Sequence, residues 1–193
     1  MWHRYMCLHT HCGTYDTHGY GRRPGGVGVT LSLTVNGDQV TLHCEAEEDL
    51  ATALRRAGYT GVKCGCDGGG CGASKVFLDG DVVMACGIDA ADAADGVVRT
   101  IEGFGTQEEL HPIQAAFVDH FAVQCGFCIP GMIVQAQALL EETPDPSERE
   151  VREAIDDNLC RCTGYQKPVE AILDAAGRMR ASEQPVTDGG FDE

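Results

Sequence analysis

Two closely spaced cysteine pairs in the C-terminal half constrain this chain more than any other feature. Cys125 and Cys128 frame the string CGFC, and Cys160 and Cys162 frame the string CRC. Four thiolates so close along a chain can complete a metal or iron–sulfur site. Both strings fall at expected junctions between helices, where the two pairs can face each other.

Spacing alone leaves more than one kind of site open for these four thiols. Structural zinc and iron–sulfur clusters both accept four thiolates. Zinc sites usually repeat the CxxC spacing, so the combination of CxxC with CxC favours a cluster. A redox-active CxxC would be expected in a thioredoxin-like βαβ context, which the pattern of this chain lacks. A zinc-stabilised structural module remains an alternative to an iron–sulfur centre.

Composition narrows the classes of protein to consider. The chain has 193 residues, of which 43% are hydrophobic, enough for a packed core. A net charge of −16 with three lysines argues against nucleic acid and against anionic membranes as partners. No apolar run is long enough to insert into a membrane, and no secretory signal is recognisable. We expect a cytoplasmic protein, in which eleven cysteines indicate metal binding before disulfides.

The two ends of the chain differ from the rest. Residues 1–26 hold four of the seven histidines and two cysteines but show no period of strand or helix. We interpret them as a disordered arm or a start assigned too far upstream, with a small His/Cys metal site as the alternative. Residues 181–193 are polar and predict a flexible tail.

Residues 27–103 show the signals of a small strand-rich domain. Alternating apolar residues from Val29 to Val35 predict a half-buried strand, and Asn36-Gly37 predicts a type I′ turn into its partner. A helix is expected over 49–58, a second hairpin around Asp79-Gly80 and a short strand over 97–101. A few strands with one helix and a glycine-rich cysteine loop indicate a β-grasp.

Residues 104–180 change to helical periodicity. The capping box from Thr106 to Glu109 predicts a helix start, and Pro130 predicts another after CGFC. A second capping box begins at Ser147, and a last helix is expected over about 168–180. This half predicts a small four-helix bundle, so the fold class is α+β. Inward positions in the first and third helices are expected to include Leu110, Ile113, Phe117, Phe121 and Leu159.

The residues around the C-terminal pairs resemble one known family closely. The strings are QCGFC at 124–128, PGM at 130–132 and NLCRCTGY at 158–165. Together they are similar to the iron–sulfur subunit of the molybdenum hydroxylases, the family of xanthine dehydrogenase, aldehyde oxidoreductase and aerobic carbon monoxide dehydrogenase. The resemblance covers about residues 27–180. Ile129 departs from it, since the family usually has threonine there, but this position ligates nothing.

The resemblance implies a function and a set of partners. It implies a plant-ferredoxin-like β-grasp followed by the helical half, each holding one [2Fe-2S] cluster. Electrons would pass from a molybdenum–pterin large subunit through both clusters to FAD on a medium subunit. Cys162 would lie nearest the pterin and Gln124 beside it, although Gln124 can also be read as a helix-terminal side chain. We expect no catalytic residue on this chain, and a stand-alone ferredoxin-like carrier is the alternative.

The upstream cysteine set departs from the family at one position. The plant-type spacing C-x4-C-x2-C…C assigns Cys66, Cys71 and Cys86 as ligands, but Ser74 stands where the third cysteine is expected. Ser74 could ligate through oxygen, Cys64 could substitute for the missing thiol, or the site could be incompletely occupied. Cys44 lies outside both sets, and we read it as a buried free thiol.

Overall fold

The computed structural model of the chain describes residues 28–45, 47–66 and 69–183. The expected N-terminal arm and the end of the expected tail lie outside these ranges. None of the helices in the described ranges combines the length and the apolar character that a membrane crossing requires. The strands are β1 (Val29–Val35), β2 (Asp38–Cys44), β3 (Lys75–Leu78), β4 (Asp81–Met84) and β5 (Val97–Arg99), and the helices are α1 (Leu50–Arg56), α2 (Pro112–Asp119), α3 (Ile129–Glu142), α4 (Glu148–Ala154) and α5 (Gln166–Glu183), with short 3-10 helices η1 (Ala85–Gly87), η2 (Ala90–Ala93) and η3 (Ile101–Gly103).

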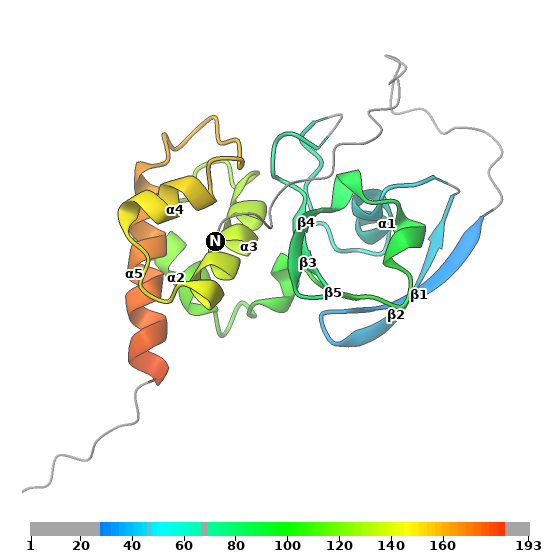
Figure 1. Cartoon of the computed structure of the whole chain (residues 1–193), viewed down its shortest axis with the longest axis horizontal. Coiled ribbons are helices and arrows are strands. Elements are labelled where there is room, and N and C mark those ends of the chain that lie inside the picture. The colour runs from blue at the N-terminus through cyan, green and yellow to red at the C-terminus, as the bar shows by residue number, and fades with distance from the viewer. Residues whose placement is uncertain (1–27, 46, 67–68, 184–193) are drawn as a thin grey trace, which may run out of the picture.

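The strands form one mixed five-stranded sheet in the order β2-β1-β5-β3-β4. The hairpins β1–β2 and β3–β4 are antiparallel, and β5 runs parallel to β1. Asn36-Gly37 and Asp79-Gly80 each place two consecutive residues at positive φ, as a type I′ turn requires. The helix α1 packs against the sheet (Figure 1). The buried core between them includes Leu33, Val35, Leu50, Leu54, Val76 and Val98.

The helices α2 to α5 gather on the other side of the molecule, and α3 faces β3 and β4 (Figure 1). Pro130 lies in the first turn of α3, and Ser147 and Glu150 form the expected capping box of α4. α5 runs on to Glu183, past the end expected near residue 180. The α+β class is confirmed. The buried core shared by these helices includes Ile113, Phe117, Met132, Val151, Ile155 and Ile172.

The expected start of the first helix of this half is wrong. α2 begins at Pro112, and its capping box is formed by His111 and Gln114. The Thr106 hydroxyl does accept the Glu109 N–H at 3.1 Å, but this bond closes a local turn. Helix cannot continue through His111, because the residue before a proline is driven out of the helical region.

Three side chains expected to face inward are exposed instead. Leu110 precedes the true start of α2, and Phe121 follows its end, with φ +54° and 83% exposure. Leu159 lies beyond the end of α4 and is 65% exposed. In each case the apolar period of the sequence extends beyond the helix itself, before its start at Leu110 and after its end at Phe121 and Leu159. These residues therefore form surface rather than core.

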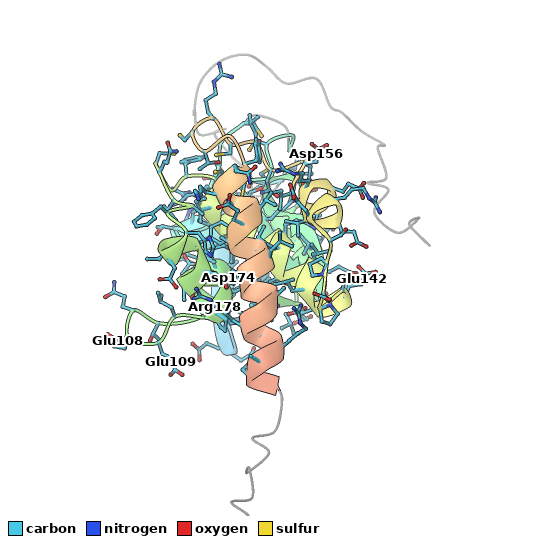
Figure 2. The ribbon with its side chains drawn as sticks, turned by 90° about the vertical axis from the view of Figure 1, so that its left-hand side faces the viewer. Glu108, Glu109, Glu142, Asp156, Asp174 and Arg178 are labelled. Carbon is cyan, nitrogen blue, oxygen red and sulfur yellow. The ribbon has the colours of Figure 1, made fainter. Side chains whose placement is uncertain are left out.

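A face of the helical half is strongly acidic. Figure 2 shows Glu108, Glu109, Glu142 and Asp156 extending outward around α5. On the same face Arg178 bonds to Asp174 at 2.6 Å and to Asp119 at 2.7 Å. Asp174 also contacts His120 at 3.0 Å. Charge as well as packing therefore joins α5 to α2.

The two halves meet through a buried polar contact centred on Lys75. Its side chain is 3% exposed, and its ammonium donates to Gln135 at 2.7 Å, Asp157 at 2.5 Å and Asn158 at 2.9 Å. Burial lowers the pKa of Lys75, and the hydrogen bond to Asp157 opposes that effect. All three donors of the ammonium are therefore used to tie the first strand residue of β3 to the helical half.

Replacing Lys75 by methionine should weaken this contact. The substitution keeps an unbranched chain of similar length but leaves the buried Asn158 oxygen without its donor. The free energy of unfolding should fall by about 1–3 kcal/mol, as measured by urea denaturation. Lys167→Met is the control, because Lys167 is exposed and pairs with Glu170 on the same helix. Equal losses of unfolding free energy in both variants would contradict the role of Lys75 in joining the two halves.

Candidate metal centres

The structure brings the four C-terminal cysteines together. Cys125 and Cys128 lie in the turn between α2 and α3, and Cys160 and Cys162 lie in the loop between α4 and α5. The sulfurs of Cys125 and Cys162 are 3.4 Å apart, and the thiols of Cys128 and Cys160 are hydrogen-bonded to each other. Each close pair therefore takes one cysteine from CGFC and one from CRC.

Local backbone features hold the two loops in this shape. Gly126 has φ +79° within the CGFC turn, a conformation that glycine adopts without strain. In the second loop the Tyr165 hydroxyl accepts the Cys160 N–H at 2.8 Å and donates to the Asn158 carbonyl at 3.0 Å. The side chain of Tyr165 thus fixes the backbone on both sides of Leu159.

The four thiols differ in burial and in acidity. Cys128 and Cys160 are buried, whereas Cys125 and Cys162 are exposed. Burial and the neighbouring Cys160 thiol raise the pKa of Cys128 to about 12. Burial alone would also raise the pKa of Cys160, but hydrogen bonds from the Thr163 hydroxyl and N–H outweigh it and lower the value. Metal binding must displace the protons of the protonated thiols.

This donor set fits an iron–sulfur cluster. Across residues 28–45, 47–66 and 69–183, no three His, Cys, Asp or Glu side chains gather tightly enough to hold a single metal ion. The thiols gather in pairs instead. A cluster with four cysteine ligands and two irons takes two thiolates at each iron, which matches the two pairs. N–H groups also reach the sulfurs, since Phe127 donates to Cys125 and lowers its pKa.

The upstream set fits such a cluster in part. The Cys66 and Cys71 thiols are hydrogen-bonded to each other, and Cys86 lies in η1. Burial raises the pKa of both Cys71 and Cys86. The Ser74 hydroxyl donates to the Cys86 sulfur at 3.1 Å. Three thiols and one hydroxyl therefore face this centre.

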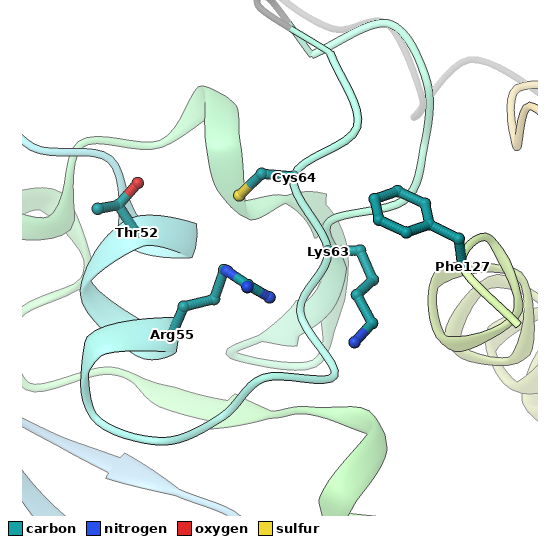
Figure 3. Close-up of a pocket in the computed structure, with 5 residues that line it drawn as sticks. All are labelled: Thr52, Arg55, Lys63, Cys64 and Phe127. Carbon is teal, nitrogen blue, oxygen red and sulfur yellow. The ribbon is translucent and has the colours of Figure 1, made fainter. Parts of the chain in front are cut away.

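Cys64 lines a separate cavity of about 270 Å³ with Thr52, Arg55, Lys63 and Phe127. Figure 3 shows its side chain directed toward α1, while Lys63 leaves the backbone on the side of Phe127. Cys64 packs against the core of the strand-rich half. Cys64 therefore lines this cavity, whereas the Ser74 hydroxyl occupies the expected ligand position beside Cys86.

Gln124 lies exposed beside Cys125, at the surface where Cys162 also emerges.

Sequence reasoning missed the contacts between the two centres. A methyl group added to Gly65 would lie 2.9 Å from the Phe127 ring and 3.2 Å from the Cys71 sulfur, so Phe127 sits against the upstream loop. The Leu159 N–H also donates to the Cys71 carbonyl at 2.9 Å. Neither contact has a local sequence signal.

Comparisons with known proteins agree with this arrangement. Residues 33–99 match the model of the 2Fe-2S iron-sulfur cluster binding domain, and residues 100–173 match that of the [2Fe-2S] binding domain. The chain is 45% identical to the nicotine 6-hydroxylase small subunit of Paenarthrobacter nicotinovorans over 152 residues, which are 78% of this chain and 92% of that subunit. A solved chain of quinoline 2-oxidoreductase from Pseudomonas putida 86 superposes with a TM-score of 0.77 at 39% identity, covering 81% of this chain and 99% of that one.

A longer relative shows the same match within a larger chain. Aldehyde oxidoreductase of Megalodesulfovibrio gigas is 48% identical over 163 residues, which are 82% of this chain but 18% of that protein. Two adjoining cluster-binding domains define an iron–sulfur protein. The chain belongs to the family of [2Fe-2S] iron–sulfur subunits of the molybdenum hydroxylases.

Proposed function

We propose that this chain relays single electrons from a molybdenum–pterin partner subunit to an FAD-binding partner subunit. When bound, the two clusters supply the one-electron chemistry. The chain's own residues hold them, order the path between them and form the docking surfaces. The proposed ligands of the C-terminal cluster are Cys125, Cys128, Cys160 and Cys162, and those of the N-terminal cluster are Cys66, Cys71, Cys86 and one further residue.

The observation that carries this proposal is the direct contact between the two ligand loops. The Cys71 carbonyl accepts the Leu159 N–H at 2.9 Å, and Leu159 is bonded to Cys160. One hydrogen bond thus joins a proposed ligand of one cluster to the residue that precedes a proposed ligand of the other. Phe127, between Cys125 and Cys128, lies against Gly65 on the same side. Electron transfer needs two centres held rigid and close together, and these contacts supply both conditions.

An exposed apolar surface around Cys125 and Cys162 supports docking of the molybdenum subunit. Phe121 and Leu159, which are close in sequence to the two cysteine strings, are mostly exposed, as are the Cys125 and Cys162 thiols. Exposed apolar patches beside functional groups often mark interfaces between proteins. We propose that Gln124 and Cys162 face the pterin of the partner. Val123 and Phe127, before and within the CGFC string, are exposed apolar residues as well.

The two buried cores support a division into a β-grasp domain over 27–103 and a helical cluster domain over 104–180. We propose that α2 to α5 act as a small four-helix bundle that carries the C-terminal cluster. Thiolate-held iron suits a reducing compartment, so we expect the protein to work in the cytoplasm.

Phe121→Asp should weaken association with the molybdenum subunit without removing iron. An exposed aromatic side chain at the centre of an interface contributes about 2 kcal/mol or more, which corresponds to a roughly 30-fold fall in affinity. Binding of the purified variant to the molybdenum subunit would be measured by calorimetry. Val97→Asp is the control, because Val97 is an exposed apolar residue at the start of β5. Similar losses in both variants would remove Phe121 from the interface.

The iron content and cluster signals of the full-length protein test whether the chain carries the two clusters that a relay requires. Anaerobically purified protein should contain about four irons per chain and show two distinct cluster signals in electron paramagnetic resonance after reduction. A colourless, folded, zinc-containing protein would contradict the proposal and favour the zinc module. Red-brown protein that never associates with a molybdenum subunit would favour a stand-alone ferredoxin-like carrier.

A further inference from the structure

Ser74 stands within the upstream thiol group as a deeply buried hydroxyl. Its residue exposure is 1%. The hydroxyl donates to the Cys86 sulfur at 3.1 Å and accepts the Cys86 N–H at 3.4 Å. The Ser74 carbonyl also accepts the Ala85 N–H at 3.1 Å, so the backbone holds residue 74 beside η1. The oxygen is therefore fixed next to a proposed cluster ligand.

The Ser74 hydroxyl donates to a weak hydrogen-bond acceptor. A thiol sulfur is a weak hydrogen-bond acceptor, and a buried hydroxyl normally finds a stronger one. Cys86 in turn interacts with Cys66, and Cys66 is hydrogen-bonded to Cys71. Ser74 is thus the one hydroxyl in a row of contacting groups whose three other members are thiols. A ligand bond to iron would give its oxygen a strong partner.

Cys64 is poorly placed to substitute for a missing thiol. Its side chain points toward α1 (Figure 3), and it interacts more strongly with the charges of Asp49 and Arg55 than with the Cys86 and Cys66 thiols. The preceding residue is held at both ends, since the Lys63 N–H donates to the Ala73 carbonyl at 3.4 Å and the Lys63 ammonium donates to the Thr60 carbonyl at 2.7 Å. Turning the Cys64 side chain toward these thiols would remove it from its packing position against the core of the strand-rich half.

We infer that Ser74 Oγ is the fourth ligand of the N-terminal cluster and that Cys64 is not a ligand. This inference rests on the proposed function, because it presumes a cluster at the upstream site. As the oxygen–iron bond forms, the Ser74 O–H bond breaks and its proton passes to solvent, with no change in electron count. Oxygen is a harder donor than thiolate and favours the more oxidised iron. The N-terminal cluster should therefore have a lower reduction potential than its four-cysteine form.

Three variants of the full-length protein test the inference by iron and sulfide content, electron paramagnetic resonance and redox titration. In Ser74→Ala the N-terminal signal should be lost or changed in g values. In Ser74→Cys that signal should remain, with a raised midpoint potential and absorbance shifted to longer wavelength. Cys64→Ala should match the wild type in all three readouts. The C-terminal cluster signal, present in every variant, reports that each protein has folded.

Several results would overturn the inference. A lost N-terminal signal in Cys64→Ala with an unchanged Ser74→Ala would assign the ligand to Cys64. Equal losses in both variants, or identical potentials in Ser74→Cys and the wild type, would also remove Ser74 as the ligand. A wild type with one signal and about two irons would mean that the upstream site holds no cluster. A wild type without iron would instead end the proposed function itself.

Discussion

Cys160→Ala is expected to eliminate the C-terminal cluster, whereas Cys162→Ala should retain part of it. Cys160 is buried, so solvent cannot readily replace its thiolate at iron. Its sulfur also receives the Thr163 N–H and contacts the Thr163 hydroxyl at 3.0 Å, a setting that alanine leaves without an acceptor. Cys162 is exposed, and water can approach the position that it vacates. Iron per chain should fall by about half in Cys160→Ala and by less in Cys162→Ala.

The same variants should separate in electron transfer. Cys160→Ala should show one cluster signal after reduction and no electron flow from the molybdenum subunit to a dye acceptor. Cys44→Ala is the control, since Cys44 is buried at the end of β2 and belongs to neither thiol set. It should keep its full iron content. A Cys160→Ala protein with both signals intact would remove Cys160 from the ligand set.

The C-terminal centre could be predicted from sequence because its signals are local. Two cysteine strings at helix junctions were sufficient to predict that the pairs face each other, and the structure brings them together. Which cysteine pairs with which could not be predicted. That pairing, Cys125 with Cys162 and Cys128 with Cys160, depends on how the loop between α4 and α5 packs against the turn between α2 and α3. The packing of both loops decides it.

The upstream centre shows a different limit. The sequence placed Ser74 at the expected ligand position and left the choice open between Ser74, Cys64 as its substitute and an incompletely occupied site. The direction of the Cys64 side chain is set by its packing against α1 and the sheet core, which no local pattern encodes. The hydrogen bonds from Lys63 to the Ala73 and Thr60 carbonyls form only when the folded loop brings these groups together.

Features of the fold that depend on local residues could likewise be predicted, whereas those that depend on distant contacts could not. Both hairpins were predicted because their turn residues, such as Asn36 and Gly37, carry the backbone preference in themselves. The start of α2 was misjudged because Thr106 makes its expected hydrogen bond in a turn that does not continue as helix. Phe121 and Leu159 were assigned to the core by extending an apolar period beyond the helix ends. Their exposure instead gives the surface that a partner subunit would cover.

Gly72→Ala is expected to disrupt the contact between the two halves. Gly72 has φ +70°, and a methyl group there would lie 2.5 Å from the Asp157 carbonyl oxygen and 2.9 Å from the Asn158 Cα. The left-handed conformation costs a non-glycine residue about 1–2 kcal/mol. Overpacking against backbone atoms adds about 1–3 kcal/mol. The free energy of unfolding should therefore fall by about 2–5 kcal/mol, as measured by urea denaturation.

Gly80→Ala separates these two causes. Gly80 has a similar φ of +93°, but nothing lies within 4 Å of its added methyl group. It should lose only the conformational part, about 1–2 kcal/mol. The methyl group at position 72 would also move the Cys71 carbonyl away from the Leu159 N–H. Both groups belong to the same contact, in which Asn158 donates to the Gly72 carbonyl at 2.8 Å. Magnetic coupling between the two reduced clusters should therefore weaken in Gly72→Ala and persist in Gly80→Ala. Equal stability and equal coupling in the two variants would mean that the close approach at Gly72 does not hold the two centres together.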